Sequence, residues 1–526
     1  MGHACLFVLA LITFTTASPS PDGEDFARFH TLPNLRPPLL NVTLFEPGLE
    51  SPPTASYQPD QTGPAIYDNH GHLIWSGASS FPGRNAYDFR AVTPEARNQS
   101  ELSFIISKNK YLPERPNGAA VRLNSAYELV EETAPLSGTP FFNIHEYNII
   151  NNGTSVLLVY SDPVKIDGIW VFDDGFAEID LTTGTTLFKW NSLANLHLNS
   201  SYLKQPEPKA TSEKNAWDWF HANSVDKNSD GDYIISSRHT SCIYKISGTD
   251  GSILWKLGGK DSHFDHIAGF NFLWQHDARF RFENTTTTII SLFNNAGTGD
   301  SIKGQATAPW SSALVVALET SITPMTARVL QRFDRPDHQR SIARGNVQIL
   351  PNENVLVGWA ADGYISEFSP SGSLALEARF VASKMISYRS YKFNFTGTPS
   401  TPPSTKSYVY GTSPKTATTV LYVSWNGATE VASWNFYGSS SSSSSSSKSD
   451  TTEEEEEEEE EEGLFSLLGN VAKSDFETMF MTNGYTPYIY AEALSTDGKA
   501  IGRSIIQASE IPQAWISLGF FICVNQ

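Results

Sequence analysis

Short apolar stretches that close on a tryptophan recur along the chain, and each of them follows a turn that contains glycine. The stretch 180–190 reads Asp-Leu-Thr-Thr-Gly-Thr-Thr-Leu-Phe-Lys-Trp, and the stretches 69–75 and 247–255 have the same order. A glycine turn beside short apolar runs is typical of a β-hairpin. A weaker copy at 367–377 lacks the tryptophan, and 431–436 supplies another tryptophan-bearing strand. The pattern therefore predicts a chain of repeated hairpins.

A second phrase precedes several of these hairpins: a polar residue at a strand start, a turn, and a strand rich in Ile, Val, Leu and Ser. His145, His221 and His276 each open such a phrase, and 345–359 continues the series without a histidine. Short strands at regular spacing, with a repeat of several tens of residues and no long helical periodicity, predict an all-β propeller in a single domain. A β-sandwich is the main alternative, but it does not require histidines at one phase of a repeat.

The shared phase of these histidines is the functional signal. Equivalent positions in successive blades point to the mouth of the central channel, so the three imidazoles are expected to converge on one pocket. A lone histidine is more often an ordinary core or surface residue, but three at one phase favour a site. Imidazoles also bind zinc, copper or iron. Against a metal, no carboxylate or thiolate completes the set in the sequence, and Arg238 would repel a cation.

Half of the net negative charge of the chain comes from one short segment. The formal net charge is -20, but ten glutamates form one run at 453–462, and without that run the acidic excess falls by half. No basic stripe is present that could neutralise phosphates, so nucleic acid is excluded as a partner. The aromatic content of 12% against 18% charged residues supplies material for a large core, as in β-rich extracellular proteins.

The N-terminus predicts secretion. An apolar run followed by small residues within 1–18 is typical of a signal peptide, although no Lys or Arg precedes it. Cys5 leaves with that segment, so Cys242 and Cys523 are the only mature cysteines and a disulfide scaffold is excluded. No stretch reaches the roughly twenty apolar residues of a membrane span. Six sequons are candidate glycosylation sites, at Asn41, Asn98, Asn152, Asn199, Asn284 and Asn394.

Whole phrases in the middle of the chain resemble the arylsulfotransferase family: Asp-Trp-Phe-His-Ala-Asn-Ser-Val-Asp at 218–226, Ser-Ser-Arg-His-Thr-Ser at 236–241, Ile-Leu-Trp-Lys-Leu-Gly-Gly at 253–259 and Trp-Gln-His-Asp-Ala-Arg at 274–279. The phrase Val-Ser-Trp-Asn-Gly-Ala-Thr at 423–429 is similar to the secreted fungal branch. The resemblance implies a six-bladed propeller. It also implies transfer of a sulfuryl group from a phenolic sulfate donor to a phenolic acceptor, both small molecules, without a nucleotide donor.

The resemblance also implies the roles of the site residues. It makes His276 the nucleophile, surrounded by residues that hold the sulfuryl oxygens and protonate the departing phenolate: His145, His221, Asn223 and Arg238. The chemistry fits, because a sulfate monoester needs cationic N–H donors at its oxygens and a neutral imidazole can attack sulfur to give a sulfohistidine. No metal or other cofactor is needed. His239 is expected to face away from Arg238, because neighbours in a strand point in opposite directions.

Two other functions stay open. One is a non-catalytic secreted propeller that binds a ligand or partner in its channel, and the other is a metal-dependent propeller enzyme. The expected organisation departs from the family in its Ser- and Glu-rich insertion and in its C-terminal tail. The expected segments are a signal peptide at 1–18, an N-terminal extension at 19–64, the propeller at 65–438, a disordered insertion at 439–463, and 464–526, which completes the propeller and ends in the atypical tail.

Overall fold

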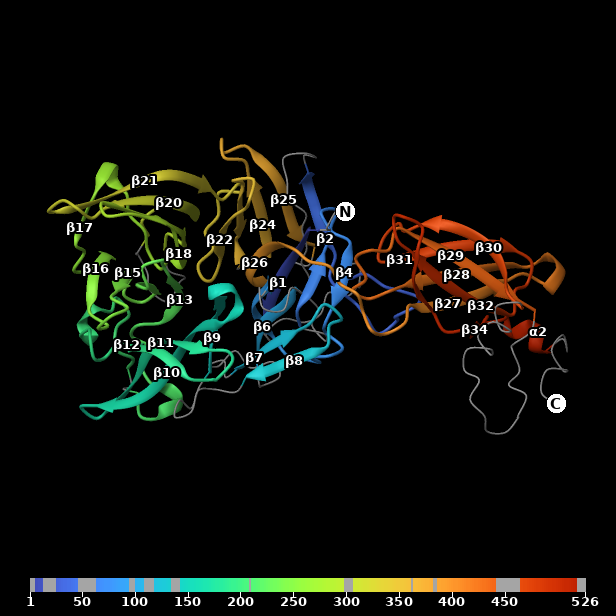
Figure 1. Cartoon of the computed structure of the whole chain (residues 1–526), viewed down its shortest axis with the longest axis horizontal. Helices are drawn as coiled ribbons and strands as arrows, with labels where there is room; N and C mark the ends of the chain where they lie inside the picture. The colour runs from blue at the N-terminus through green and yellow to red at the C-terminus, as the bar shows by residue number, and fades with distance from the viewer. Residues whose placement is uncertain are drawn as a thin grey trace. The chain divides into compact units, whose positions relative to one another are not determined.

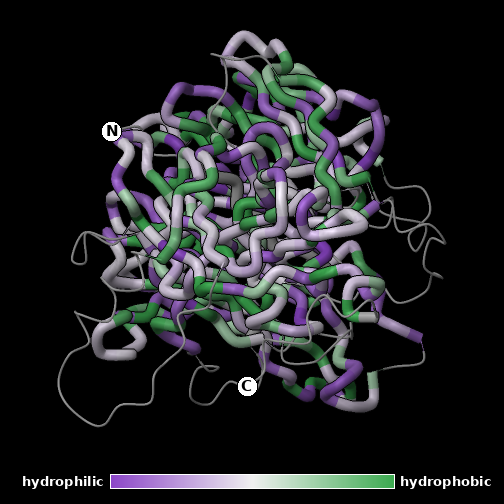
Figure 2. Tube along the Cα trace, turned by 90° about the vertical axis from the view of Figure 1, so that its right-hand side faces the viewer, coloured by the Kyte–Doolittle hydropathy of each residue, from purple (hydrophilic) through white to green (hydrophobic). Residues whose placement is uncertain are grey.

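The computed structural model describes residues 5–12, 25–45, 63–93, 100–107, 118–133, 142–207, 210–297, 306–360, 363–381, 386–440 and 464–517. Within these ranges the chain is almost entirely β-strand, so the expected all-β class is confirmed. Helical structure among them is limited to α2 (Gln513–Ser517) and the 3-10 turns η1 (Asn151–Gly153), η2 (Leu198–Ser200), η3 (Glu213–Asn215), η4 (Ile267–Gly269) and η6 (Pro414–Thr416). Figure 1 shows the strands, and Figure 2 shows hydrophobic and hydrophilic segments interspersed along the trace.

The chain divides into two compact units. The larger unit comprises Met1–Phe26, Pro37–Gly71 and Ser76–Phe395, and the smaller comprises Ala27–Arg36, His72–Trp75 and Thr396–Gln526. This differs from the expected single domain. The difference arises after residue 395, where the strands pair among themselves as described below.

Six separate sheets of four or five strands, almost all antiparallel, make up the larger unit, except for residues 73–75 of the first sheet, which belong to the smaller unit. In hydrogen-bonding order the first three are β26 (Ile386–Asn394), β1 (Cys5–Ile12), β3 (Ala65–Tyr67), β4 (Leu73–Ser76); β5 (Ala86–Val92), β6 (Glu101–Ser107), β7 (Gly118–Leu123), β8 (Leu129–Thr133); and β9 (Phe142–Ile150), β10 (Ser155–Ile166), β11 (Ile169–Asp180), β12 (Thr186–Asn191). The other three are β13 (Ala222–Lys227), β14 (Tyr233–Ser237), β15 (Cys242–Ile246), β16 (Ile253–Gly258); β18 (His276–Glu283), β19 (Thr287–Asn294), β20 (Ser312–Glu319), β21 (Met325–Asp334), β17 (Phe264–His266); and β22 (Asn346–Ile349), β23 (Val355–Gly358), β24 (Tyr364–Phe368), β25 (Leu374–Phe380), β2 (Leu40–Phe45). The predicted hairpins are therefore present as β3–β4, β11–β12, β15–β16 and β24–β25.

One strand of each sheet lies beside strands of the neighbouring sheets. Contacts run from β5 to β9, from β9 to β13, from β13 to β18, from β18 to β22, from β22 to β26, and from β26 back to β5. We refer to these six as the inner strands. No single sheet closes on itself; the sheets instead meet through their inner strands.

Two tryptophans of the repeated phrase, Trp190 and Trp255, pack between neighbouring sheets. Trp190 of β12 is 3% exposed and joins Trp219, Phe220 and Tyr244 in one apolar cluster. Its indole nitrogen donates to the backbone oxygen of Gly251 at 3.1 Å, so the ring's polar atom is satisfied by the turn of the next sheet's hairpin. The repeated tryptophan is therefore part of the packing that joins neighbouring sheets.

Bulges interrupt the inner strands near their first residues. The register shifts between Tyr87 and Arg90 in β5, and between His276 and Arg279 in β18. His221, just before β13, has a left-handed φ of 57°, and Asp277 has one of 53°. A bulge bends a strand and redirects a side chain, and left-handed backbone is uncommon outside glycine. The local backbone is therefore irregular where the predicted histidines occur.

The smaller unit contains two sheets. One is β27 (Ser404–Tyr410), β28 (Thr418–Ser424), β31 (Glu477–Asn483), and the other is β30 (Ser466–Ala472), β29 (Ser433–Ser439), β32 (Tyr488–Leu494), β33 (Ala500–Arg503), with β34 (Gln507–Ala508) beside β32. Leu421, Trp434, Phe436 and Ile489 share one buried cluster between them. Burial alternates along β29, as expected for a sheet with one covered face.

This pairing changes the expected role of segment 464–526. Its strands flank β28 and β29, which precede the insertion, and so they complete the smaller unit. Residues 441–463 of the expected insertion, and the tail 518–526 with Cys523, lie outside the described residues.

The structure also bears on the expected signal peptide, the cysteines, the membrane spans and the glycosylation sites. Residues Cys5–Ile12 of the expected signal peptide form β1, paired with β26 and β3, and the signal peptide stays a prediction. Cys242 is buried, and burial raises the pKa of its thiol to about 12. None of the described helices is long and apolar enough to span a membrane. Five sequon asparagines are exposed and Asn98 lies outside the described residues; the five are Asn41, Asn152, Asn199, Asn284 and Asn394.

Candidate active site

The inner strands bring six side chains of one repeat phase together. The ring centroids of His145 and His221 are 4.7 Å apart, and those of His145 and Tyr388 are 5.7 Å apart. Tyr388 in turn lies 5.6 Å from Tyr87, centroid to centroid. One residue comes from the start of each inner strand or from the residues just before it: Tyr87, His145, His221, His276, Arg344 and Tyr388. The backbone N–H of Arg344 reaches Nε2 of His276 at 3.2 Å, and burial, His221 and His276 all lower the pKa of His145. The three predicted histidines therefore lie in one cluster.

His276 is held in a defined tautomer. Its Nδ1 lies 2.7 Å from Oδ1 of Asn295, an acceptor, so Nδ1 carries the proton. The Nε2 atom accepts the backbone N–H of Arg344 at 3.2 Å. Burial, with the charge of Arg238 as the next cause, lowers the pKa of His276 well below its ordinary value. The imidazole is consequently neutral, with its lone pair at Nε2.

Arg238 and His239 both belong to the cluster. They lie in the turn after β14, where the strand rule of opposite directions does not apply, so the expectation that His239 faces away is wrong. Nη1 of Arg238 lies 2.8 Å from Nε2 of His239, and the ring centroids of His239 and His221 are 4.6 Å apart. The guanidinium stacks 4.4 Å from the ring centroid of Trp274.

The charge of Arg238 is not neutralised by a direct carboxylate contact among the described residues. Its Nη2 donates to the backbone oxygen of Ile342 at 3.3 Å, and its Nε is buried with no hydrogen-bond partner in the described part of the chain. Burial lowers the pKa of Arg238 to about 10, so it stays protonated at neutral pH. The arrangement leaves a preorganised cation with unused hydrogen-bonding capacity beside the histidines.

His221 and His145 each use Nδ1 to contact an oxygen. Nδ1 of His221 lies 2.6 Å from Oδ2 of Asp218, and Nδ1 of His145 lies 2.5 Å from Oδ1 of Asn143. Burial and the nearby His221 lower the pKa of His145 well below its ordinary value. His221 keeps 21% of its side-chain surface exposed, whereas His276 is 2% exposed. His221 is therefore the better placed of these two to meet solvent.

Asn223 lies deeper than expected. It is fully buried, and its Nδ2 donates to the backbone oxygen of Gln275 at 2.9 Å. Its own backbone oxygen accepts from Nη2 of Arg389 at 2.7 Å. One amide N–H therefore supports the residue that precedes His276, while Oδ1 of Asn223 is buried without a hydrogen-bond partner in the described part of the chain.

A layer of six charged residues follows the ring on four of the same strands. It consists of Asp88, Arg90, Glu146, Asp277, Arg279 and Arg389, all nine-tenths or more buried. Nη2 of Arg90 and Nη2 of Arg279 each approach a carboxylate oxygen of Glu146 at 2.7 Å, and Nη1 of Arg389 approaches Oδ1 of Asp88 at 2.6 Å. Burial alone would raise the pKa of Asp88, but Arg389 and Arg90 hold it below its ordinary value. The formal charges balance within this buried layer.

The family model described as "Arylsulfotransferase (ASST)" matches residues 118–381, which carry four of the six ring residues. This chain belongs to the arylsulfotransferase family. Membership indicates an arylsulfotransferase-like enzyme that acts on small molecules. No protein of curated function matches the chain.

Solved structures resemble this arylsulfotransferase-family chain only distantly. A protein of unknown function from Bacteroides caccae is 12% identical, over 63% of this chain and 94% of that chain, with a TM-score of 0.37. The Dos1 propeller is 12% identical, over 65% and 70%, with a TM-score of 0.28. The WD40 domain of SCAP from fission yeast is 8% identical, over 80% and 88%, with a TM-score of 0.26.

One group in the candidate site has a spacing that could suit a metal ion. Ligand atoms of Asp218, His221 and His239 lie within 4.8 Å of one another, so a carboxylate absent from the sequence argument does join the histidines. Both ring nitrogens of His239 are engaged, however: Nδ1 lies 2.5 Å from the backbone oxygen of Asp218, and Nε2 faces the guanidinium of Arg238. A cation would meet a permanent positive charge and no free lone pair of His239, so these residues do not fit a metal.

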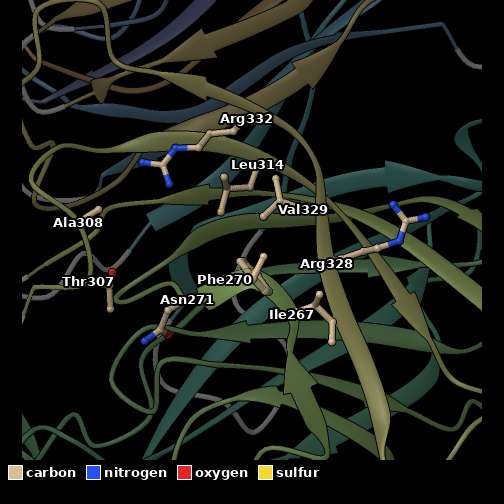
Figure 3. Close-up of a pocket in the computed structure, with 11 residues that line it drawn as sticks. Ile267, Phe270, Asn271, Thr307, Ala308, Leu314, Arg328, Val329 and Arg332 are labelled. Carbon is tan, nitrogen blue, oxygen red and sulfur yellow. The ribbon is translucent and has the colours of Figure 1, made fainter.

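A separate cavity of about 230 Å³ lies between η4 and strands β20 and β21 (Figure 3). Phe270 and Leu314 line it, together with Arg328 and Arg332. None of the predicted site residues lines this cavity. The converging imidazoles, rather than cavity size, therefore locate the candidate active site.

Sequence reasoning missed half of the ring and the whole charged layer. Tyr87, Arg344 and Tyr388 occupy the same phase as the histidines but share no residue type with them. A signal was available, because Tyr-Asp-Phe-Arg at 87–90 has the same spacing of acid and arginine as His-Asp-Ala-Arg at 276–279. Aligning the repeats by this spacing, rather than by their histidines, would have identified Tyr87 as a member of the ring.

Proposed function

We propose that this member of the arylsulfotransferase family is a secreted enzyme that transfers a sulfuryl group from a phenolic sulfate ester to a phenolic acceptor. The reaction proceeds through a sulfohistidine at His276. The observation that carries the proposal is the neutral His276 with its lone pair at Nε2, close to an arginine without a direct carboxylate partner in the described residues.

In the first half-reaction, Nε2 of His276 gives up the hydrogen bond that it accepts from the backbone N–H of Arg344 and attacks sulfur. The nitrogen–sulfur bond forms as the bond from sulfur to the phenolic oxygen breaks, and protonated His221 gives its Nε2 proton to the departing phenolate. Arg238 stabilises the negative charge of the sulfuryl oxygens with a preorganised guanidinium. The products are a free phenol, neutral His221 and His276 carrying the sulfuryl group.

In the second half-reaction, the acceptor phenol gives its proton to Nε2 of His221 while its oxygen attacks the sulfur on His276. The nitrogen–sulfur bond breaks, His276 returns to its neutral form, and His221 is protonated again. The step balances without a metal, a nucleotide or an oxidant. His145 is 4.7 Å from His221 between ring centroids and packs against it as a neutral imidazole, with its N–H directed at Oδ1 of Asn143.

We further propose that the larger unit is a six-bladed propeller of the secreted fungal type, in which each sheet is one blade. The six inner strands with their cyclic contacts support this assignment. The buried charged layer then closes one side of the channel, so that substrates reach the histidines from the other side. The same proposal includes a signal peptide at 1–18, secretion, and glycosylation at the sequon asparagines. The exposure of five of the six asparagines supports glycosylation.

Purified protein incubated with 4-nitrophenyl sulfate and phenol tests the activity. We expect release of 4-nitrophenol together with phenyl sulfate, and no release of either by His276→Ala. The matched control is His263→Ala, because His263 lies in a partly exposed loop after β16 and lines no part of the ring. Binding of aryl sulfates without transfer by the wild-type protein would favour the non-catalytic alternative. Loss of transfer after chelation, restored by a metal, would favour the metal-dependent alternative.

A further inference from the structure

We infer that Asp218 is a positioning residue for His221: its carboxylate accepts a hydrogen bond from the Nδ1–H group, so that Nε2 is the nitrogen that gives up and takes back the transferred proton. The inference rests on the proposed function, because it assigns a task in the same sulfuryl transfer. It begins with the contact of 2.6 Å between Nδ1 of His221 and Oδ2 of Asp218. A neutral imidazole has one N–H, and an acceptor at one nitrogen decides which tautomer is present.

The backbone around Asp218 is rigid. Trp219 is fully buried and its indole nitrogen donates to the backbone oxygen of Phe172 at 2.8 Å. The backbone N–H of Trp217 donates to the oxygen of Trp170 at 2.8 Å, and Phe172 donates back to Trp217 at 3.0 Å. The segment that carries Asp218 is thus attached to β11 on both sides of the residue, which limits how far its carboxylate can move.

His221 is turned toward this carboxylate by its backbone. Its φ of 57° is left-handed, a conformation that a non-glycine residue adopts only when its surroundings impose it. The backbone oxygen of His221 accepts from the N–H of Arg238 at 3.0 Å, which holds the residue in place. The strained backbone of His221 and its hydrogen bond to Asp218 both restrict the orientation of the imidazole ring.

Asp218 also reaches Arg238 through a second path. Its backbone oxygen lies 2.5 Å from Nδ1 of His239, and Nε2 of His239 lies 2.8 Å from Nη1 of Arg238. The hydrogen bond in this path uses the backbone of Asp218, whereas Oδ2 of its side chain lies 4.0 Å from Nδ1 of His239, so a change of side chain leaves the hydrogen bond in place. A substitution at Asp218 can therefore separate proton transfer by His221 from anion binding by Arg238.

The experiment compares two donors that differ in their need for a proton. Phenyl sulfate must lose a basic phenolate, whereas 4-nitrophenyl sulfate loses a stabilised anion that can leave unprotonated. Both are followed in the first half-reaction alone, as sulfuryl loading of His276 without an acceptor. We expect Asp218→Asn to slow loading from phenyl sulfate by about 10²-fold or more, the usual size of a general-acid contribution. The loading rate with 4-nitrophenyl sulfate should change by less than about tenfold, because its phenolate leaves without needing a proton.

The control is Asp230→Asn, in the exposed turn between β13 and β14, which should leave both rates unchanged. In a His221→Ala background, Asp218→Asn should cause no further loss, because residues that act as a unit are not additive. Two results would overturn the role of Asp218 and leave the proposed function intact. One is an equal loss of rate with both donors, and the other is a full additional loss of rate in the His221→Ala background. Absence of transfer by the wild-type protein with both donors would instead remove the proposed function and this inference together.

Discussion

Glu146 is the residue whose removal should most clearly reveal the role of the buried charged layer. Its carboxylate accepts from Nη2 of Arg90 at 2.7 Å, from Nη2 of Arg279 at 2.7 Å, and from both terminal nitrogens of Arg389 at 3.3 Å. It also accepts the backbone N–H of Val225 at 3.3 Å, and its side chain is fully buried. Glu146→Gln keeps the size of the side chain but removes the charge that faces three guanidinium groups.

The magnitude follows from burial and charge. Breaking a buried ionic network by removing one partner costs about 3–5 kcal/mol, because the remaining charges are left uncompensated in a place that water does not reach. The control is Asp334→Asn, whose pair with Nε of Arg332 is 2.6 Å long but has side chains 41% and 38% exposed. Exposed pairs contribute about 0–1 kcal/mol, so the control should change stability little.

Hydrogen exchange measured peptide by peptide resolves the strands concerned. The slowest amides of β9 and β18 report the global opening of the larger unit. We expect Glu146→Gln to speed their exchange by about 10² to 10³·⁵-fold, since each 1.4 kcal/mol is tenfold. A change of less than about fivefold, equal to that in Asp334→Asn, would mean that the layer does not stabilise the unit and would refute the reasoning.

Three further results are expected. Arg238→Ala should slow transfer by about 10²-fold and weaken donor binding, as stopped-flow kinetics would detect, while still allowing some sulfohistidine to form. Burial lowers the pKa values of His145 and His276, so unfolding takes up protons as pH falls below about 6.5; stability should then drop by up to about 1.4 kcal/mol per pH unit for each histidine. Urea unfolding at pH 7.5 and 5.5 measures this, and an unchanged midpoint would contradict it. Deleting residues 441–462, after Ser439 has ended β29, should leave the urea midpoint of the smaller unit unchanged.

The hairpins and the convergence of the histidines could be predicted because each depends on local, repeated patterns. Turns with glycine and short apolar runs determine hairpins wherever they occur, and Trp190 packs between sheets as its repetition indicates. The phase of His145, His221 and His276 was readable for the same reason. Position within a repeat determines where a side chain points, and the sheets carry those positions to one place.

The remaining features depend on partners that are distant in sequence. Arg389 meets Glu146 across 243 residues, and no periodicity announces such a pair. His239 was misplaced because residues 238–241 form a turn, where alternation of neighbouring side chains does not hold. The smaller unit was missed because β31 pairs with β28 across the Ser- and Glu-rich segment, and the end of the chain carries the same kind of short strands as the propeller repeat.

Covalent trapping tests the central claim most directly. The protein is mixed with an aryl sulfate labelled in its sulfuryl group, without an acceptor, then quenched in alkali and digested for mass spectrometry. We predict close to one acid-labile sulfuryl group per chain, on the peptide that contains His276, discharged when phenol is added and absent from His276→Ala. Transfer by the wild-type protein without any labelled histidine, or with the label on another residue, would contradict the mechanism.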